Sequence, residues 1–237
     1  IRDRSPSRGL GDVYKRQIFT PPTVSDPNGV AGTLMLPSQA GGTNWPGGSI
    51  DPETGIAYLY TFTTVVSLGL TNDPERSDMN FIRGRSREIP AAEVALNVDG
   101  IPLVKPPWGR ITAIDLKVGE IVWQIPHGET PDNIRNHPLL TGVDLPRTGR
   151  VGRVGTLVTK TLVIAGEAGT FTTPSGDEGA MLRAYDKATG NEVGAVYMPA
   201  GASGSPMTYM HEGQQYIVLA ISGGGFAGEL IAFRLPG

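Results

Sequence analysis

Residues 113–123 read AIDLKVGEIVW, and residues 184–194 read AYDKATGNEVG. Both stretches contain the pattern Ala-x-Asp-x-x-x-Gly at identical offsets, and the first ends in Trp123. An Asp side chain can cap a tight turn, and the Gly that follows can adopt the positive φ such turns require. Each stretch therefore predicts a strand, a tight turn and a second strand.

A related turn, DPETG, occupies residues 51–55. Asp115 follows Asp51 by 64 positions, and Asp186 follows Asp115 by 71. A four-stranded propeller blade needs only about 40–50 residues. The excess falls in two irregular segments, roughly 67–108 and 127–150, which we predict to be long loops on one face of the blades.

Short runs rich in β-branched and aromatic residues predict strands throughout the chain. They lie at 32–38, 56–62, 110–116, 120–126, 156–167, 181–186, 214–222 and 229–236. Convincing helical periodicity is absent from the sequence. Consecutive short strands with a repeat predict an all-β, antiparallel β-propeller. A β-sandwich could use the same strands, but the repeated Asp-turn-Gly favours blades.

The composition excludes several functions. The 237 residues include no cysteine, which rules out disulfides, thiolate metal sites and covalent haem attachment within this chain. A net charge of −3 gives no sign of a basic surface that binds nucleic acid. His127, His137 and His211 lack the spacing of metal ligands. We interpret Arg147, Arg150 and Arg153 as a solvated loop face, and Trp108 and Trp123 as packing residues; the alternative for Trp108 is a place near the mouth of the site.

Residues 1–17 (IRDRSPSRGLGDVYKRQ) differ from the rest in carrying five basic and two acidic side chains. They lack the apolar core of a signal peptide. The nucleotide run ATAAGAGACAG encodes Ile-Arg-Asp in one frame and, after a T, Tyr-Lys-Arg-Gln in another. We hypothesise that this non-native tail is translated adaptor DNA; the alternative is a native basic tail. Sequencing the source DNA across the codon for Ile18 tests the hypothesis.

The last repeat is shorter than the others. Residues 203–222 predict a hairpin and 229–236 a third strand, after which the sequence ends. Closed propellers commonly take the fourth strand from the other end of the chain, which removes an exposed sheet edge. We therefore expect residues 18–237 to be part of a ring, with N-terminal blades missing.

The pattern Ala-x-Asp-x-x-x-Gly-x-x-x-Trp resembles the tryptophan-docking repeat of quinoproteins, the pyrroloquinoline quinone (PQQ)-dependent dehydrogenases. Thr189 and Trp123 fit that repeat, whereas Val118 and Gly194 depart from it. Further matches lie at 18–23 (IFTPPT) with 32–38 (GTLMLPS), at 41–52 (GGTNWPGGSIDP), at 106–116 (PPWGRITAIDL) and at 199–225. The resemblance covers residues 18–237 in family order. It implies the C-terminal blades of an eight-bladed propeller with four-stranded antiparallel sheets, most like the membrane-bound glucose dehydrogenase branch.

The resemblance implies two cofactor-binding segments. The residue matching Asn44 contacts the rim of the quinone, with Trp45 beside it, and an amide can donate to cofactor oxygens without adding charge. The alternative is an Asn that satisfies its own turn, with Trp45 packed between blades. The second segment, SGGGFAG at 222–228, would offer backbone N–H groups at Gly225, Phe226 and Ala227. Its alternative is a plain flexible connection.

For activity, the resemblance implies oxidation of an aldose, polyol or alcohol hydroxyl, with electrons passed to ubiquinone or a cytochrome. Ca²⁺ would polarise the quinone carbonyl. Positions matching the family's catalytic Asp and Ca²⁺ ligands are absent here, so we expect them in the missing N-terminal part and expect this chain alone to be inactive. The family also implies a periplasmic location, with any membrane anchor in the missing part. The alternative function is a non-enzymatic scaffold built from the same repeats, as in outer-membrane assembly lipoproteins.

Overall fold

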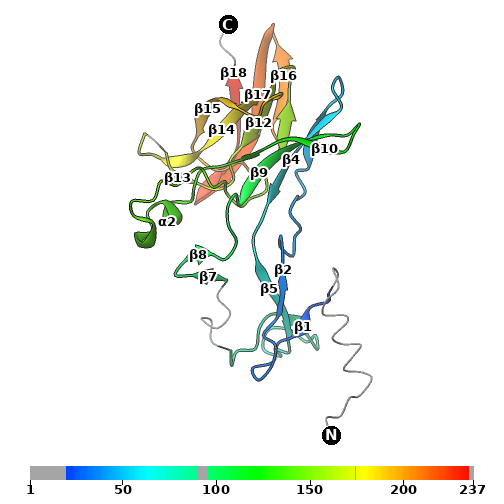
Figure 1. Ribbon diagram of the computed structural model, residues 1–237, viewed down its shortest axis with the longest axis vertical. Helices are drawn as coiled ribbons and strands as arrows, with labels where there is room; N and C mark the ends of the chain where they lie inside the picture. Colours follow the sequence, from blue (N-terminus) through cyan, green and yellow to red (C-terminus); the bar gives the residue numbers. More distant parts are fainter. Residues whose placement is uncertain (1–19, 90–95, 174, 235–237) are drawn as a thin grey trace. The chain divides into compact units, whose positions relative to one another are not determined.

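The computed structural model describes residues 20–89, 96–173 and 175–234 (Figure 1). The predicted non-native tail, residues 1–17, lies outside these ranges. Strands dominate, and the helical elements of the described part are the short α2 (Asp132–Arg135) and the 3₁₀ turn η2 (Pro138–Leu140). The chain divides into two compact units, Ile1–Gln39 with Val65–Leu103 and Ala40–Thr64 with Val104–Gly237.

The smaller unit is built around β5 (Val66–Thr71). This strand pairs in parallel with β1 (Thr23–Val24) and antiparallel with β2 (Thr33–Met35) and β6 (Ile82–Arg83). A separate hairpin joins β7 (Asn97–Val98) to β8 (Ile101–Pro102). Residues 67–108, expected to be irregular, thus hold several short strands. Two-residue strands are too short to show an alternating pattern, and the partners of β5 are distant in sequence.

The larger unit begins with a four-stranded antiparallel sheet, called here the first sheet. Its strands are β3 (Gly48–Asp51), β4 (Ile56–Phe62), β9 (Gly109–Asp115) and β10 (Glu120–Pro126), each paired with the next along the chain. The turns at Asp51 and Asp115 therefore belong to one sheet. The interpretation of their separation as an oversized blade repeat was wrong. In this sheet the turn at Asp51 joins the first strand to the second and the turn at Asp115 joins the third to the fourth, so two similar turns occur in a single blade.

The second sheet has the same plan. It contains β11 (Thr156–Val158), β12 (Leu162–Gly166), β14 (Glu178–Asp186) and β15 (Glu192–Met198), with β13 (Phe171–Thr172) paired to the start of β14. The third sheet has three strands, β16 (Met207–His211), β17 (Gln214–Gly223) and β18 (Phe226–Arg234). The predictions of four-stranded antiparallel sheets and of a three-stranded last repeat are confirmed.

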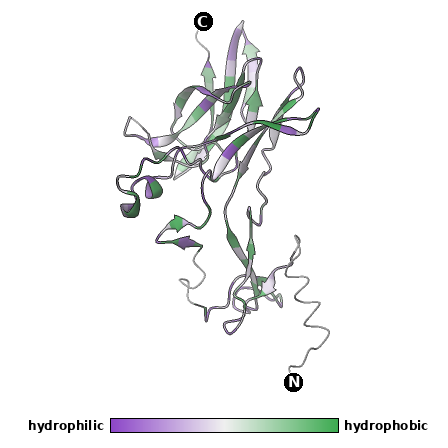
Figure 2. Cartoon of the chain, viewed as in Figure 1, coloured by the Kyte–Doolittle hydropathy of each residue, from purple (hydrophilic) through white to green (hydrophobic). Residues whose placement is uncertain are grey.

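Strand β12 shows how the sheets pack face to face. Successive side chains of a strand point to opposite faces. Val163 and Ala165 join the core with Tyr58 and Ile111 of the first sheet, whereas Ile164 joins the core with Leu219 of the third sheet. The second sheet is therefore apolar on both faces, as an internal blade must be, and the hydrophobic residues of Figure 2 fall mainly on strands.

Trp123 fastens the first sheet to the second. Its indole Nε1 donates to the backbone oxygen of Lys187, 3.0 Å away in the turn between β14 and β15. A side chain at Gly190 would place its Cβ 2.9 Å from the indole ring, so the ring lies directly on that glycine. Trp108 is buried and donates its Nε1 to the oxygen of Val104. The interpretation of both tryptophans as packing residues is confirmed.

Candidate functional site

The two ends of the sheets in the larger unit differ. At one end, called the turn end, strands are joined by the tight Asp turns that begin at Asp51, Asp115 and Asp186. The opposite end, called the connection end, carries the longer segments. These are 40–47, 127–155, 167–173 with 175–177, 199–206 and the turn 223–226. Because the strands alternate in direction, every candidate cofactor residue lies at the connection end.

The short segment 201–205 contacts both candidate cofactor regions. Ser205 Oγ donates to the oxygen of Pro46 at 3.2 Å, next to Asn44 and Trp45. Ser203 N donates to Ala220 O at 2.9 Å, and Ser222 N donates to Gly201 O at 3.0 Å. The structure thus brings 44–46 and 220–222 to the same segment, although they are far apart in the sequence.

Asn44 and Trp45 lie in a tight loop that leads into β3. Asn44 Oδ1 accepts from Trp45 N at 2.8 Å, and Gly47, with φ of 68°, donates its N–H to Asn44 O. The side-chain bond uses the amide oxygen and neither of the Nδ2 hydrogens. The bond of Asn44 Oδ1 within its own loop is the one the alternative expects of this residue, whereas Trp45, 94% exposed, is not packed between blades in the described part of the chain.

The SGGGFAG segment forms a tight hairpin turn between β17 and β18. Gly223 pairs with Phe226, and Gly223, Gly224 and Gly225 have φ of 114°, 62° and 84°. A Cβ added to any of the three would meet nothing within 4 Å, so the glycines serve backbone conformation and leave open space beside it. Phe226 packs against the core between the second and third sheets, whereas Ala227 is exposed.

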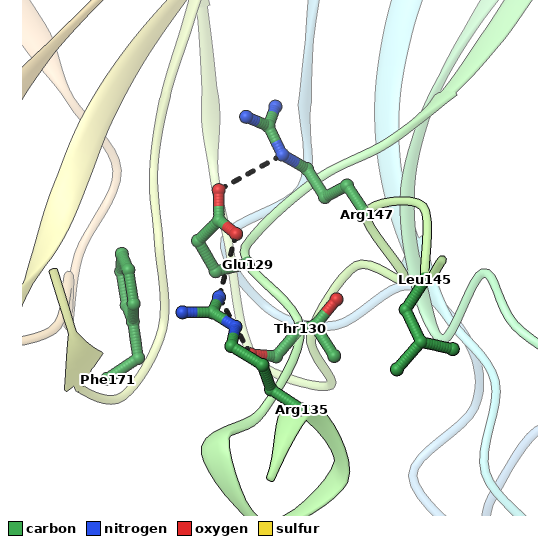
Figure 3. Close-up of a pocket in the computed structure, with 6 residues that line it drawn as sticks. All are labelled: Glu129, Thr130, Arg135, Leu145, Arg147 and Phe171. Atoms are coloured by element: carbon green, nitrogen blue, oxygen red, sulfur yellow. Dashed lines mark hydrogen bonds and ion pairs between the residues drawn. The ribbon is translucent and has the colours of Figure 1, made fainter. Parts of the chain in front are cut away.

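A pocket of about 340 Å³ also opens at the connection end (Figure 3). Glu129 stands between two guanidinium groups, with Arg147 Nε 3.2 Å from its Oε1 and Arg135 Nη2 2.9 Å from its Oε2. Thr130, Leu145 and Phe171 complete the lining. The expectation of a solvated arginine face holds for the exposed Arg153 but was wrong for Arg147, which also bonds Glu192 at 2.5 Å. It was wrong for Arg150 as well, whose half-buried side chain donates from Nη1 to the oxygen of Thr170.

Behind the pocket lies a buried charge cluster on Arg183 of β14. Its Nε is 2.5 Å from Glu167 Oε1, its Nη1 is 2.9 Å from Glu192 and its Nη2 is 2.9 Å from Glu129. Glu167 is fully buried, and burial raises the pKa of its carboxyl while the Arg183 guanidinium opposes that rise. Removing one partner of such a cluster leaves a buried charge unpaired, so the cluster holds segment 127–150 against the second sheet.

Comparison with known proteins agrees with this architecture. Residues 6–217 match the family model described as PQQ: glucose/ethanol/alcohol dehydrogenase, beta-propeller domain. This chain belongs to that quinoprotein propeller family. The three sheets of its larger unit are accordingly propeller blades, and the tryptophan-docking contact of Trp123 is a contact between blades.

Named relatives support the same family. Quinoprotein glucose dehydrogenase A of Acinetobacter calcoaceticus is 28% identical over 92% of this chain and 27% of its own length. Quinoprotein glucose dehydrogenase of Escherichia coli is 30% identical over 92% of this chain and 28% of its own length. The probable quinate dehydrogenase (quinone) of Xanthomonas campestris pv. juglandis is 30% identical over 86% of this chain and 27% of its own length. The chain thus spans under a third of each relative.

His127 lies deep in the quinoprotein propeller, between the first and second blades. Its side chain is 1% exposed, with Nδ1 2.8 Å from Tyr185 Oη and Nε2 3.3 Å from Gly166 O. A carbonyl can only accept, so Nε2 carries the proton and Nδ1 accepts from the tyrosine. Burial lowers the pKa of His127 to about 4, which keeps the ring neutral. Its role is structural.

Two further observations concern the described part of the propeller chain. Among the described residues, no group of three or more His, Asp or Glu side chains is arranged to bind a metal ion. Within the same ranges, no helix has the length and apolar character needed to span a membrane. The residues described above offer hydrogen bonding, an exposed aromatic surface and a guanidinium-lined pocket.

Proposed function

We propose that this chain forms cofactor-facing blades of a PQQ-dependent dehydrogenase that oxidises a sugar, polyol or alcohol hydroxyl. The observation that carries the proposal is the convergence of segments 44–46 and 220–222 on segment 201–205. Both lie at the connection end, and relatives of the chain are named as glucose and quinate dehydrogenases. A pure scaffold needs the blades but neither the Asn44–Trp45 pair nor the glycine turn at 223–225.

The residues at this end fit a planar, acceptor-rich cofactor. The Asn44 amide donates hydrogen bonds to oxygens without adding charge, and the exposed Trp45 indole offers a large apolar surface for a flat ring. Because no atom crowds the missing Cβ positions of Gly223 to Gly225, a ligand can approach the backbone at Gly225, and we assign the next N–H groups, of Phe226 and Ala227, to the same contact. When bound, PQQ supplies the redox chemistry, and these residues bind and orient it.

The remaining parts of the reaction belong to residues outside this sequence in our proposal. We assign the proton-accepting carboxylate and the Ca²⁺ ligands to other blades of the same protein, because no residue here has the matching position. Ubiquinone or a cytochrome would take the electrons, and the protein would act in the periplasm with any membrane anchor outside these residues. The chain alone should then reduce no dye in the presence of PQQ, Ca²⁺ and glucose.

Tryptophan fluorescence can test the cofactor contact. The sequence has three tryptophans, of which Trp45 is 94% exposed and Trp108 is 5% exposed, whereas Trp123 is half-buried in the blade junction. PQQ titrated into the full chain should quench the emission saturably. The quenching should be lost in Trp45→Phe and retained in Trp123→Phe, which serves as the matched control.

Two results would count against the proposal. Saturable quenching that survives in Trp45→Phe would show that the cofactor binds away from this loop. A chain that folds, as judged by its circular dichroism, yet shows no saturable quenching would favour the non-enzymatic scaffold. A second variant, Asn44→Ala, should weaken PQQ binding about five- to tenfold if its amide donates one hydrogen bond to the cofactor.

A further inference from the structure

Arg150 and Asp132 converge on the chain segment around Phe171. Arg150 donates from Nη1 to the oxygen of Thr170, and the central carbon of its guanidinium group lies 5.6 Å from the Phe171 ring centroid. Asp132 Oδ2 accepts from Thr172 N at 2.8 Å and from Thr172 Oγ1 at 3.0 Å. The two charged side chains therefore hold the two residues that flank Phe171.

A third charged side chain, Glu167, lies at the start of the same segment. It is fully buried, and its Oε1 lies 2.5 Å from Arg183 Nε and accepts from Glu129 N at 3.1 Å. A Cβ added to Gly128 would lie 2.9 Å from Arg150 Cβ, so the Arg150 side chain passes directly over that backbone. Arg150 and Glu167 thus contact adjacent residues of one stretch of backbone.

Four buried atoms of these three side chains make no hydrogen bond within the described part of the chain. They are Nε and Nη2 of Arg150, Oε2 of Glu167 and Oδ1 of Asp132. Burial lowers the pKa of the Arg150 guanidinium, and the nearby carboxylates of Glu167 and Asp132 oppose that change. Buried donors and acceptors are almost always hydrogen-bonded, so these four atoms require a partner.

Bonds that the side chains already make keep them from turning toward one another. Nη1 of Arg150 donates to Thr170 O, and Oε1 of Glu167 accepts from Arg183 and from Glu129 N. The two carboxylates would oppose a bound anion, and the guanidinium group would oppose a bound cation. A water molecule can accept from the guanidinium and donate to the carboxylates, and a buried water typically makes about three hydrogen bonds.

We propose that about one or two internal water molecules bridge Arg150 to Glu167 and Asp132. Two donor atoms and two acceptor atoms match the hydrogen-bonding capacity of such water. The bridge joins three parts of the chain that are far apart in sequence, since Asp132 begins α2, Arg150 lies near the end of the long connection and Glu167 follows β12.

The bridge also supports the segment that contacts both candidate cofactor regions. The backbone oxygen of Glu167 accepts from Ala202 N at 2.7 Å, and Ala202 lies within 201–205. The water therefore helps to fix the residue on which that segment rests. The inference itself stands without the cofactor, because every group that it uses belongs to this chain.

A crystal structure of the full chain without PQQ tests the inference directly. We expect ordered water within hydrogen-bond distance of both Arg150 and Glu167 Oε2. Direct pairing of Arg150 with either carboxylate would overturn the inference, as would an absence of ordered solvent between them. A bromide soak separates water from a halide ion, because an anomalous signal at the site would show a bound anion and overturn the assignment to water.

Oxygen-17 magnetic relaxation dispersion counts long-lived internal water in solution. Arg150→Met keeps an unbranched apolar side chain and removes both unpartnered donors, so the number of such waters should fall by about one. Arg153→Met makes the same change at an exposed position and should leave the number unchanged. An unchanged number in an Arg150→Met chain that folds, as judged by circular dichroism, would overturn the bridge. If that variant does not fold, the crystal structure of the wild type decides the question.

Discussion

His127 links the packing of the first two blades to pH. Its folded pKa of about 4 lies well below the ordinary value of 6.5, because burial disfavours the charged ring. Between these values the unfolded chain binds more protons than the folded chain. The stabilisation is therefore complete above about pH 6.5 and is lost as the pH falls toward 4.

The magnitude follows from the two pKa values. A shift of about 2.5 units corresponds to about 3 kcal/mol of unfolding free energy at most, of which about 2 kcal/mol is lost between pH 7 and pH 5. The ring is 1% exposed, so solvent screens this effect little. A neutral side chain at position 127 should remove the dependence.

Urea unfolding at several pH values can measure this effect in the wild type and in His127→Gln. The glutamine amide can still donate to Gly166 O, but it does not titrate. Carboxylates titrate in both proteins, so the difference between their unfolding free energies isolates His127. We expect that difference to shrink by about 2 kcal/mol from pH 7 to pH 5. Tyr185→Phe, which removes the hydroxyl partner and keeps the imidazole, should retain a pH dependence of the wild-type kind. A difference that stays constant with pH would refute the assignment of a depressed pKa to this histidine.

Two other predictions concern the blades. Gly149 has φ of 68°, and a Cβ there would lie 1.9 Å from Gly109 O, so Gly149→Ala should lower the unfolding free energy by more than about 3 kcal/mol. Gly119 has φ of 77° and open space around it, so Gly119→Ala should lower the unfolding free energy by only about 1 kcal/mol. Equal decreases for the two variants in urea unfolding would contradict the steric argument. Trp123→Phe removes the indole donor to Lys187 O, which still accepts from Tyr58 Oη. We therefore expect the unfolding free energy to fall by only about 1 kcal/mol. Val122→Ala on the same strand is exposed and should change the unfolding free energy by less than about 0.5 kcal/mol; a similar effect of both changes would show that the indole does not dock.

The sequence predicted most of the blade architecture because the decisive signals are local. The turn at Asp186 needs only its own side chain, which accepts from Thr189 N at 2.9 Å, and a glycine at position 190 with φ of 76°. Strand positions follow from residue type in the same way. The relation between turns does not follow from residue type, since Asp51 and Asp115 look alike whether they share a blade or lie in successive ones. Only the pairing of β4 with β9 decides that they share one.

The candidate pocket was not predictable from local pattern, because its residues come from separate segments. Glu129 and Arg147 lie in one long connection, Glu192 begins β15, and Arg183 lies within β14. One signal of the buried charge cluster was present: Arg183 interrupts the apolar run of β14, between the buried Leu182 and the buried Tyr185 two positions further on. A long charged residue inside a buried strand requires carboxylate partners, but nothing in the sequence says which ones.

The division of the larger unit into two ends explains why binding and stability can be separated. The turn end is closed by short turns and by contacts such as Lys187 Nζ to Asp51 Oδ2 at 2.7 Å, which hold neighbouring blades together. The connection end carries segments whose length the blades do not fix, including Trp45, the glycine turn and the arginine pocket. Changes of residue at the connection end can therefore alter what the propeller binds while the docking of Trp123 keeps the blades in place. For this reason, the Trp45→Phe variant should fold normally, and loss of binding in it reports on a site and not on the fold.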